Sequence, residues 1–388
     1  MRRLLNPQFG LVLVFLGIIA GVPLSQIAVE LGRGDRPQAL QVFKQKPTSR
    51  NLRAYEHRLE DASWAATKLR PWAQYAQFAW FRDGGEKSVV GRGGWLFYRP
   101  GLEFLTERQG TRQRTGNAAE AVGAIIDLRD QLRARGIQLL VMPVPNKESV
   151  YPERLTVRAA GLRSAIGSET GELMKRLKAA EVEVVDLFEL FADAKTLSPS
   201  ASSPLYLAQD SHWSPAGVEL AARAVGKKIF DHNWVQVGSV AYELQPAPVR
   251  RVGDVLRMLQ IPLLESETAA EIVPCKRVLR RDTVSPYQDD VASQILVLGD
   301  SFLRIYETDE PGAAGFIAHL ARELNQPVTS IVNDGGASTL VRQELSRRPA
   351  WLANKKVVIW EFVERDIRLG LEGWQHVPLP TEKDIGSL

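Results

Sequence analysis

Short apolar runs alternate with amphipathic helical segments through most of this 388-residue chain. The runs are apolar at successive positions, which is typical of strands covered on both faces of a parallel sheet. Between them, apolar residues recur at the spacing of helices that pack on such a sheet. The pattern predicts an α/β fold, a three-layer α/β/α sandwich with a mostly parallel sheet. The expected strands are residues 137–145, 182–188, 295–298, 328–332 and 356–362, and the expected helices are residues 118–135, 169–180, 215–230, 313–325 and 340–348.

The N-terminus carries a separate apolar segment. Residues 9–29 follow two arginines and contain no charged side chain, and their length just crosses a hydrocarbon core of about 30 Å. The preceding arginines favour a cytoplasmic N-terminus and an exported body. Residues 11–20 also have the length of a signal-peptide core, so a cleavable signal is the alternative, and a buried core helix is a third. We therefore assign residues 1–30 to an N-terminal membrane anchor or signal segment.

The sequence pattern divides the rest of the chain into two parts. Residues 31–85 begin with a basic stretch and continue with clustered aromatic residues, which indicates a stem followed by an aromatic helical segment. Residues 86–388 carry the alternating pattern and form the expected main domain. Within it, residues 231–291 break the alternation, which predicts an insertion beside the functional edge of the sheet.

Composition narrows the possible functions. The net charge of +4 is small and both signs are interspersed, so a nucleic-acid partner is not implied. The single cysteine, Cys275, excludes an internal disulfide and a cysteine-rich metal site. The remaining residues show no spacing typical of metal ligands, and we expect neither a metal nor a cofactor.

The tripeptide Gly299-Asp300-Ser301 ends an expected strand and precedes a helix-compatible run. Ser301 can be a nucleophile on the tight turn after a buried strand. Alternatively, Asp300 and Ser301 only cap a helix. Leu303 stands where the G-x-S-x-G turn of α/β-hydrolases has its second glycine, so that turn is not indicated. The nucleophile interpretation requires a base and an orienting carboxylate elsewhere in the chain.

His212 is the histidine with suitable neighbours, because it stands in "AQDSHWSPAG" two residues after Asp210. Ser214 and Pro215 provide a helix N-cap and an N1 proline, so the following helix fixes the loop that carries His212. Asp210, His212 and Ser301 can therefore fill the three roles of a Ser-His-Asp triad, if a loop conformation brings the first two together. The alternative is that Asp210 and Ser214 are turn and cap residues and His212 is a surface histidine.

Several stretches resemble one known family. "GDSF" and "DSHW", together with "GRGGWLFY", "VPNKESVYPERL", "VGDVLRMLQIP" and "VVIWEFVERDI", resemble the SGNH-hydrolase-like domain of the AlgJ/AlgX family of alginate O-acetyltransferases. The resemblance covers residues 89–367 and is closer to the AlgJ branch, since little chain follows the last expected strand. It implies a permuted SGNH-hydrolase-like catalytic domain, because the Asp-His block precedes the serine.

The resemblance also implies a reaction. Ser301 would accept an acetyl group, His212 would be general base and acid, and Asp210 would orient His212. The acetyl group would pass to a hydroxyl of an exopolysaccharide, alginate-like or cellulose-like, and a membrane-bound O-acyltransferase partner would be its source. The implied location is the periplasm, anchored to the inner membrane by the N-terminal segment or released if that segment is cleaved.

Two other functions fit the same residues. A carbohydrate acetylesterase would use the same triad and pass the acyl group to water. A non-catalytic scaffold subunit of a polysaccharide-modification complex would keep these residues for structural reasons.

An acyl-transfer site also needs an oxyanion hole, for which the backbone N–H of Ser301 is the first expected donor. Asn146 and Asn333 follow expected strands, at the edge where open α/β sheets bind ligands, so each is a candidate second donor. Asn333 lies in a glycine turn, and turn chemistry alone can explain it. Candidate substrate contacts, with a solvated surface role as the alternative, are Lys147, Arg304 and Tyr306.

Overall fold

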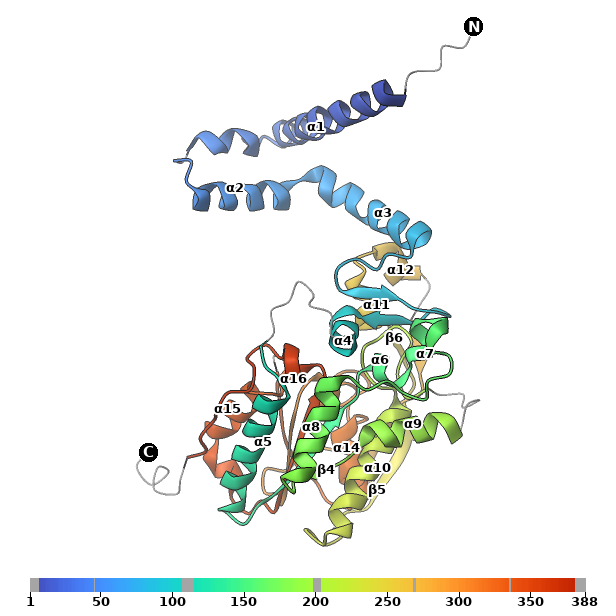
Figure 1. The fold of residues 1–388 in the computed structure, drawn as a ribbon, viewed down its shortest axis with the longest axis vertical. Helices are drawn as coiled ribbons and strands as arrows, with labels where there is room; N and C mark the ends of the chain where they lie inside the picture. Colours follow the sequence, from blue (N-terminus) through green and yellow to red (C-terminus); the bar gives the residue numbers. More distant parts are fainter. Residues whose placement is uncertain are drawn as a thin grey trace. The chain divides into compact units, whose positions relative to one another are not determined.

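The computed structural model describes residues 7–44, 46–106, 115–197, 204–267, 270–334 and 336–380. The chain forms two compact units, one of residues up to Asp83 with Gln260–Leu263, the other of Gly84–Leu259 and the residues from Leu264 onward. The first unit contains α1 (Pro7–Gly32), a 3-10 helix (Gln38–Lys44), α2 (Ser49–Ala62) and α3 (Trp64–Phe81) (Figure 1). Among the described helices, Gly10–Gly32 is long and apolar enough to cross a membrane, a property that signal sequences share.

The second unit is built on a five-stranded parallel sheet in the order β10-β9-β11-β3-β4. Alternate residues along each strand face opposite cores, as Leu139 and Leu140 of β3 illustrate. Both faces of the sheet are therefore buried, which explains the continuous apolar runs in the sequence. The strands are β3 (Gln138–Val144), β4 (Glu183–Val184), β9 (Ile295–Gly299), β10 (Thr329–Val332) and β11 (Val357–Val363).

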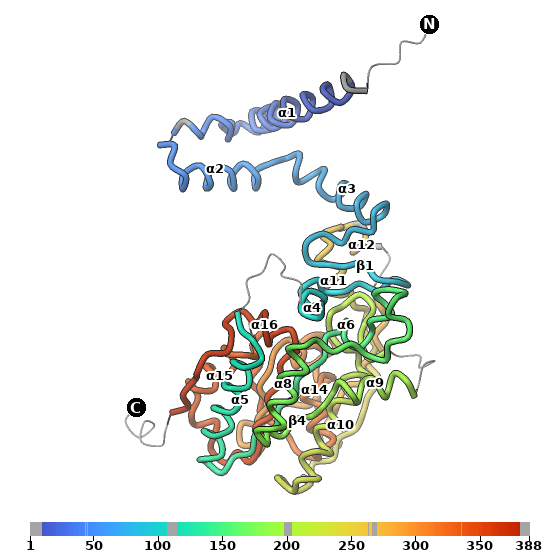
Figure 2. Tube along the Cα trace, in the orientation of Figure 1, coloured from blue at the N-terminus to red at the C-terminus, as the bar shows by residue number. Residues whose placement is uncertain are grey.

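Helices cover the two faces of this sheet, as the backbone trace shows (Figure 2). One core is completed by α5 (Ala118–Arg133), α8 (Ser168–Ala179) and α15 (Leu340–Ser346). The opposite core is completed by α9 (Leu187–Leu197), α10 (Pro215–Asp231) and α14 (Phe316–Leu324). The predicted three-layer α/β/α sandwich with a parallel sheet is confirmed.

One predicted strand is mostly wrong. Only Glu183–Val184 of the expected strand 182–188 forms β4, and α9 begins at Leu187. The side chain of Asp186 accepts hydrogen bonds from the N–H groups of Phe188 and Glu189, at 3.0 and 3.2 Å. These bonds satisfy the first N–H donors of the helix and end the strand. A seven-residue apolar run does not show where a strand gives way to a helix.

Residues 231–291, the predicted insertion, form small elements outside the central sheet. β5 (Tyr242–Pro246) pairs with β8 (Lys276–Arg280), and β6 (Val249–Arg251) pairs with β7 (Glu271–Val273), both antiparallel. The same stretch contains α11 (Asp254–Met258) and α12 (Pro262–Glu267). The domain boundaries, including those of this insertion, remain a prediction.

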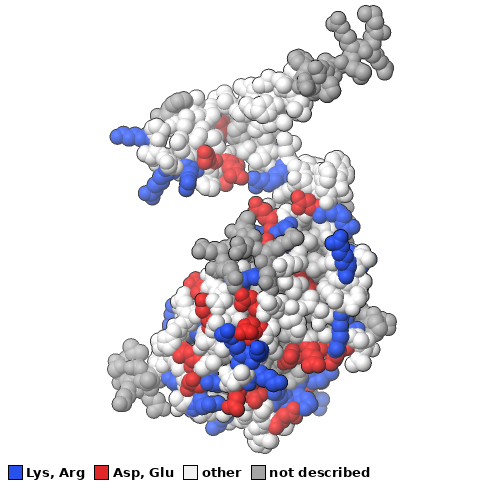
Figure 3. Space-filling model, in the orientation of Figure 1, with Lys and Arg blue, Asp and Glu red and all other residues white. Residues whose placement is uncertain are grey.

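On the surface that Figure 3 displays, acidic and basic side chains are interspersed over the second unit.

The other elements of the chain are short. The short elements are β1 (Ser88–Val90), β2 (Leu96–Tyr98), α4 (Arg99–Leu105), α6 (Lys147–Val150), α7 (Pro152–Leu155), α13 (Ser301–Arg304), α16 (Asp366–Leu369) and the 3-10 helices Val157–Ala159 and Pro349–Leu352.

Candidate active site

Ser301 is the first residue of α13, in the tight turn that follows β9 at the carboxyl edge of the sheet, and Asp300 is the N-cap. The N–H of the preceding residue, Asp300, donates to Oε2 of Glu361 on β11 at 3.0 Å. The carboxylate of Asp300 in turn accepts from the N–H of Phe302 at 2.8 Å. The turn is thus fixed on both sides of Ser301, whose own N–H has no acceptor among the described residues. That free donor is what an oxyanion hole requires.

His212 lies between Ser301 and Asp210. Its Nε2 is 2.9 Å from Oγ of Ser301, and its Nδ1 is 2.7 Å from Oδ1 of Asp210. A neutral imidazole with its proton on Nδ1 donates to Asp210 and leaves Nε2 free to accept the Ser301 proton. The three residues therefore have the hydrogen-bond order that a nucleophilic serine requires, while their catalytic roles remain a prediction.

The loop around His212 folds as its sequence indicates. The N–H of His212 donates to the side chain of Asp210, so a tight turn joins residues two apart in sequence. Ser214 caps α10, which begins at Pro215. Trp213 is fully buried and its indole N–H donates to the carbonyl of Phe302 at 3.1 Å. The turn that carries Ser301 and the loop that carries His212 are therefore joined directly.

A second carboxylate, Asp254 on α11, supports this loop. Its side chain accepts from both the N–H and the hydroxyl of Ser211, at 2.6 and 2.5 Å. Its own N–H donates to Oδ2 of Asp210, which also accepts from Nε of Arg251 at 2.9 Å. Gly253 permits this approach, because a Cβ there would lie 2.1 Å from the carbonyl oxygen of Gln209.

The electrostatics follow from these contacts. Burial by itself would raise the pKa of Asp210, but the charge and hydrogen bond of His212, with Arg251, lower that pKa well below its ordinary range. Burial by itself would lower the pKa of His212, but Asp210 and Asp254 raise it above its ordinary value of 6.5. Burial is the main cause that raises the pKa of Asp254, and the charge of Asp210 raises this pKa further. The site therefore stabilises a protonated His212 beside an ionised Asp210.

Ser301 and His212 open into a pocket of about 600 Å³, hereafter the catalytic pocket. Its described lining includes Arg251, Asp254 and Arg304. Potential metal ligand atoms of Asp210, His212 and Asp254 lie within 4.8 Å of one another. However, Nδ1 of His212 is bonded to Asp210, whose other oxygen holds Arg251, and a guanidinium there opposes a divalent cation. The set fits hydrogen-bonded acid–base chemistry better than metal binding.

Asn146 lies just beyond β3 and is almost fully buried. Its N–H donates to Glu364 at 2.6 Å and its side-chain oxygen accepts from Arg365 at 3.3 Å. This leaves its side-chain NH₂ buried and without a partner among the described residues. The guanidinium of Arg365 lies 6.0 Å from the ring of Phe302, next to Ser301. The oxyanion role predicted for Asn146 remains a prediction.

Two predicted substrate contacts are wrong, because their side chains are buried in the protein. The ammonium of Lys147, which is 1% exposed, donates to the carbonyls of Leu96, Ala208 and Asp210 at 2.5 to 2.9 Å. It therefore holds the backbone of the Asp210 loop. Tyr306 is fully buried, and its hydroxyl donates to the carbonyl of Trp213 at 3.2 Å.

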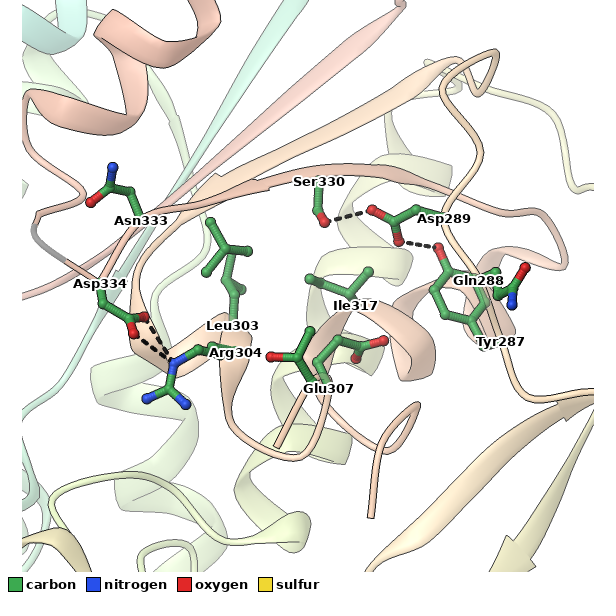
Figure 4. Close-up of a pocket in the computed structure, with 12 residues that line it drawn as sticks. Tyr287, Gln288, Asp289, Leu303, Arg304, Glu307, Ile317, Ser330, Asn333 and Asp334 are labelled. Atoms are coloured by element: carbon green, nitrogen blue, oxygen red, sulfur yellow. Dashed lines mark hydrogen bonds and ion pairs between the residues drawn. The ribbon is translucent and has the colours of Figure 1, made fainter. Parts of the chain in front are cut away.

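Arg304 and Asn333 differ from Lys147 and Tyr306, because they line pockets at the site. Arg304 lines the catalytic pocket and pairs with Asp334 and Asp309. It also lines a neighbouring pocket, together with Asn333 (Figure 4). The N–H of Asn333 donates to the carbonyl of Gly299 at 3.0 Å. The substrate role of Arg304 and the oxyanion role of Asn333 remain predictions.

The sequence interpretation assigned no role to Arg251 or Asp254. Both lie in or next to "VGDVLRMLQIP", in the stretch that breaks the alternating pattern. The Gly-Asp pair before a helix was the available signal, since glycine allows close backbone approach and aspartate favours helix starts.

Comparison with known proteins agrees with this architecture. Residues 89–364 match the family model described as "SGNH hydrolase-like domain, acetyltransferase AlgX". The chain is 26% identical over 303 residues to "Probable alginate O-acetylase AlgJ" of Pseudomonas putida, covering 74% of this chain and 72% of that protein. The counterpart in Pseudomonas fluorescens is also 26% identical, over 297 residues, covering 74% and 69%.

Two solved structures have a similar fold. The O-acetyltransferase domain of Pseudomonas putida AlgJ superposes with a TM-score of 0.52 at 20% identity, covering 72% of this chain and 91% of that chain. Pseudomonas aeruginosa AlgX gives the same TM-score and identity, covering 71% and 61%. Because the family match spans well over half of its length, the chain belongs to the AlgX family of SGNH hydrolase-like acetyltransferases.

Proposed function

We propose that this protein is a polysaccharide O-acetyltransferase that works through an acetyl ester on Ser301. The observation that carries the proposal is the unbroken hydrogen-bonded series Ser301–His212–Asp210, which opens into a pocket. Membership of an acetyltransferase family and curated relatives named as alginate O-acetylases support the acyl group and a polysaccharide acceptor.

In the first step, Oγ of Ser301 attacks the carbonyl carbon of an acetyl donor while Nε2 of His212 takes the serine proton. The free N–H of Ser301 faces the developing oxyanion, with Asn146 as the proposed second donor. When the tetrahedral intermediate collapses, protonated His212 gives its proton to the leaving group. An acetyl ester on Ser301 results.

In the second step, a sugar hydroxyl attacks this ester and His212 takes the hydroxyl proton. The collapse transfers the acetyl group to the sugar oxygen, and the proton on His212 returns to Ser301. Asp210 stabilises the imidazolium in both steps, in keeping with its lowered pKa. Water in place of the sugar would make the protein an acetylesterase, which is the alternative.

The proposal includes a location. The apolar helix Gly10–Gly32 suits a signal anchor that holds the catalytic unit in the periplasm at the inner membrane. There, a membrane-bound O-acyltransferase partner would supply the acetyl group from the other side of the membrane.

The test uses the purified full chain, an activated acetyl ester and an acetyl-free oligosaccharide. Ser301→Ala should lower ester turnover by about 10⁴-fold or more, while Ser346→Ala, at the end of α15, should leave it unchanged. Acetylated oligosaccharide formed by wild type but not by Ser301→Ala would support the transferase. Turnover into water alone would favour the esterase, and equal rates in wild type and Ser301→Ala would leave a scaffold role.

A further inference from the structure

A second pocket of about 700 Å³ lies beside the catalytic pocket. Arg304 and Asp334 line both pockets, and the ion pair between these two side chains forms the wall that the pockets share. We propose that this second pocket, hereafter the distal pocket, binds an uncharged pyranose unit of the acceptor polymer, next to the unit that receives the acetyl group. This inference rests on the proposed function, because a polymer acceptor occupies more than the reacting position.

The distal pocket combines a polar rim with an apolar base, in which Leu303 and Ile317 are almost fully buried and Val332 is half-buried. Figure 4 shows Leu303 and Ile317 between Arg304 and Asp334 at one end and Asp289 at the other. Hydrogen-bonding side chains that line the pocket are Gln288, Thr308, Ser330 and Asn333. A sugar ring presents C–H groups on its faces and hydroxyls at its edge, so it matches such a surface. The volume lies within the usual range of small-molecule sites.

Charge decides the kind of sugar. Among the described residues that line the distal pocket, Arg304 is the only cation, and it is already paired with Asp334 and Asp309. Asp289 adds a further carboxylate, which accepts from Tyr287 and Ser330. The carboxylate of a uronate would therefore meet like charge without a free cation, which is unfavourable.

The third acid that lines the distal pocket, Glu307, does not change this balance of charge. Its carboxylate accepts from the N–H of Ala318 at 3.1 Å, at the start of α14. Burial raises the pKa of Glu307 to about 8, and in either protonation state this acid offers no cation to a uronate carboxylate. The hydroxyls of an uncharged sugar can accept from or donate to every polar group at this rim.

The experiment measures binding of two tetrasaccharides with the same β-1,4 linkage, cellotetraose and tetramannuronate, to the full chain in detergent micelles by titration calorimetry. Thr308→Trp places a large side chain in the distal pocket from an exposed position. The matched control is Thr196→Trp, also exposed, on α9 and outside the described pocket linings. No acetyl donor is present, so the measurement does not depend on turnover.

We expect cellotetraose to bind more tightly than tetramannuronate. We also expect Thr308→Trp to weaken cellotetraose binding by about tenfold or more, and Thr196→Trp to leave it unchanged. Equal affinities of the two variants would overturn the site, and tighter binding of tetramannuronate by wild type would overturn the choice of sugar. Failure of the proposed function would show separately, as ester turnover that does not depend on Ser301.

Discussion

At the residue scale, His212 is placed between two carboxylates with different tasks. Asp210 is 2.7 Å from Nδ1 and fully buried, so it fixes the imidazole tautomer. Asp254 is 3.6 Å from the same nitrogen, and its hydrogen bonds go to Ser211. Asp254 therefore acts on His212 mainly through its charge and through the loop.

This difference predicts two distinct variants. Asp210→Asn should lower kcat/KM by about 10⁴-fold, because an amide at this position favours the wrong tautomer. Asp254→Asn should act mainly on the pH dependence. His212 must be neutral to accept a proton, so activity rises with pH through its pKa, which lies above 6.5. Removing the Asp254 charge lowers that pKa, and the acid limb of the profile should move to lower pH.

The measurement is kcat/KM for an activated acetyl ester across pH. Asp282→Asn, an exposed position paired with Arg280, is the control and should keep the wild-type profile. An acid limb in Asp254→Asn that stays in place or moves to higher pH would contradict this electrostatic role.

At the element scale, the turn from β9 to α13 depends on the absence of a side chain at Gly299. A Cβ there would lie 2.3 Å from Oε2 of Glu361 and 2.5 Å from Cδ1 of Leu303. Glu361 is the residue that holds the N–H of Asp300. Burial, followed by the charge of Asp300, raises the pKa of Glu361 well above its ordinary value.

Gly299→Ala should therefore displace Glu361 and the turn that carries Ser301. We expect a loss of about 1–3 kcal/mol in the free energy of unfolding. Ester turnover should fall by a larger fraction than the free energy of unfolding does. Gly123→Ala is the control, because a Cβ on that residue of α5 meets nothing within 4 Å. It should stabilise the protein by about 0.5–1 kcal/mol. Denaturant titration and turnover of both variants check this, and a fully active, equally stable Gly299→Ala would contradict it.

Prediction succeeded for the long or capped helices and for the short buried strands β9 and β10, and it failed at β4. The 3.6-residue periodicity identified α5 and α10, and their caps, Asn117 and Ser214, are side chains that accept from the first turn. The run that became β4 and α9 is equally compatible with strand or helix by its apolar content. There the hydrogen bonds of Asp186 decide, and they depend on backbone geometry.

At the scale of the whole molecule, the apolar helix at the N-terminus fits a signal anchor or a signal peptide. Within Gly10–Gly32 the mean hydropathy is 2.3, and the most apolar part of this helix is not buried in the protein. Such a surface is stable in a bilayer and costly in water.

We therefore expect the chain to sediment with membranes and to be released by detergent with its apolar N-terminal segment still attached. Mass spectrometry of the extracted protein is the measurement. Ile19→Arg with Val22→Arg should reduce membrane insertion, since each arginine near the centre of a span costs about 2.5–3.5 kcal/mol. A lower mass, together with a protein that does not sediment with membranes, would instead identify a cleaved signal peptide.

The sequence by itself determined the α/β class, most strands and helices of the second unit, and the identity of Asp210, His212 and Ser301 as candidates. These features are encoded locally, in periodicity, caps and short motifs. Only the tertiary structure decided that Ser301 and His212, 89 positions apart, lie 2.9 Å from each other. It also brought Arg251 and Asp254 to the site and buried Lys147. The reason is that a polar side chain acquires its partners from chain segments remote in sequence, and no local pattern records which carbonyl or carboxylate folding will bring to it.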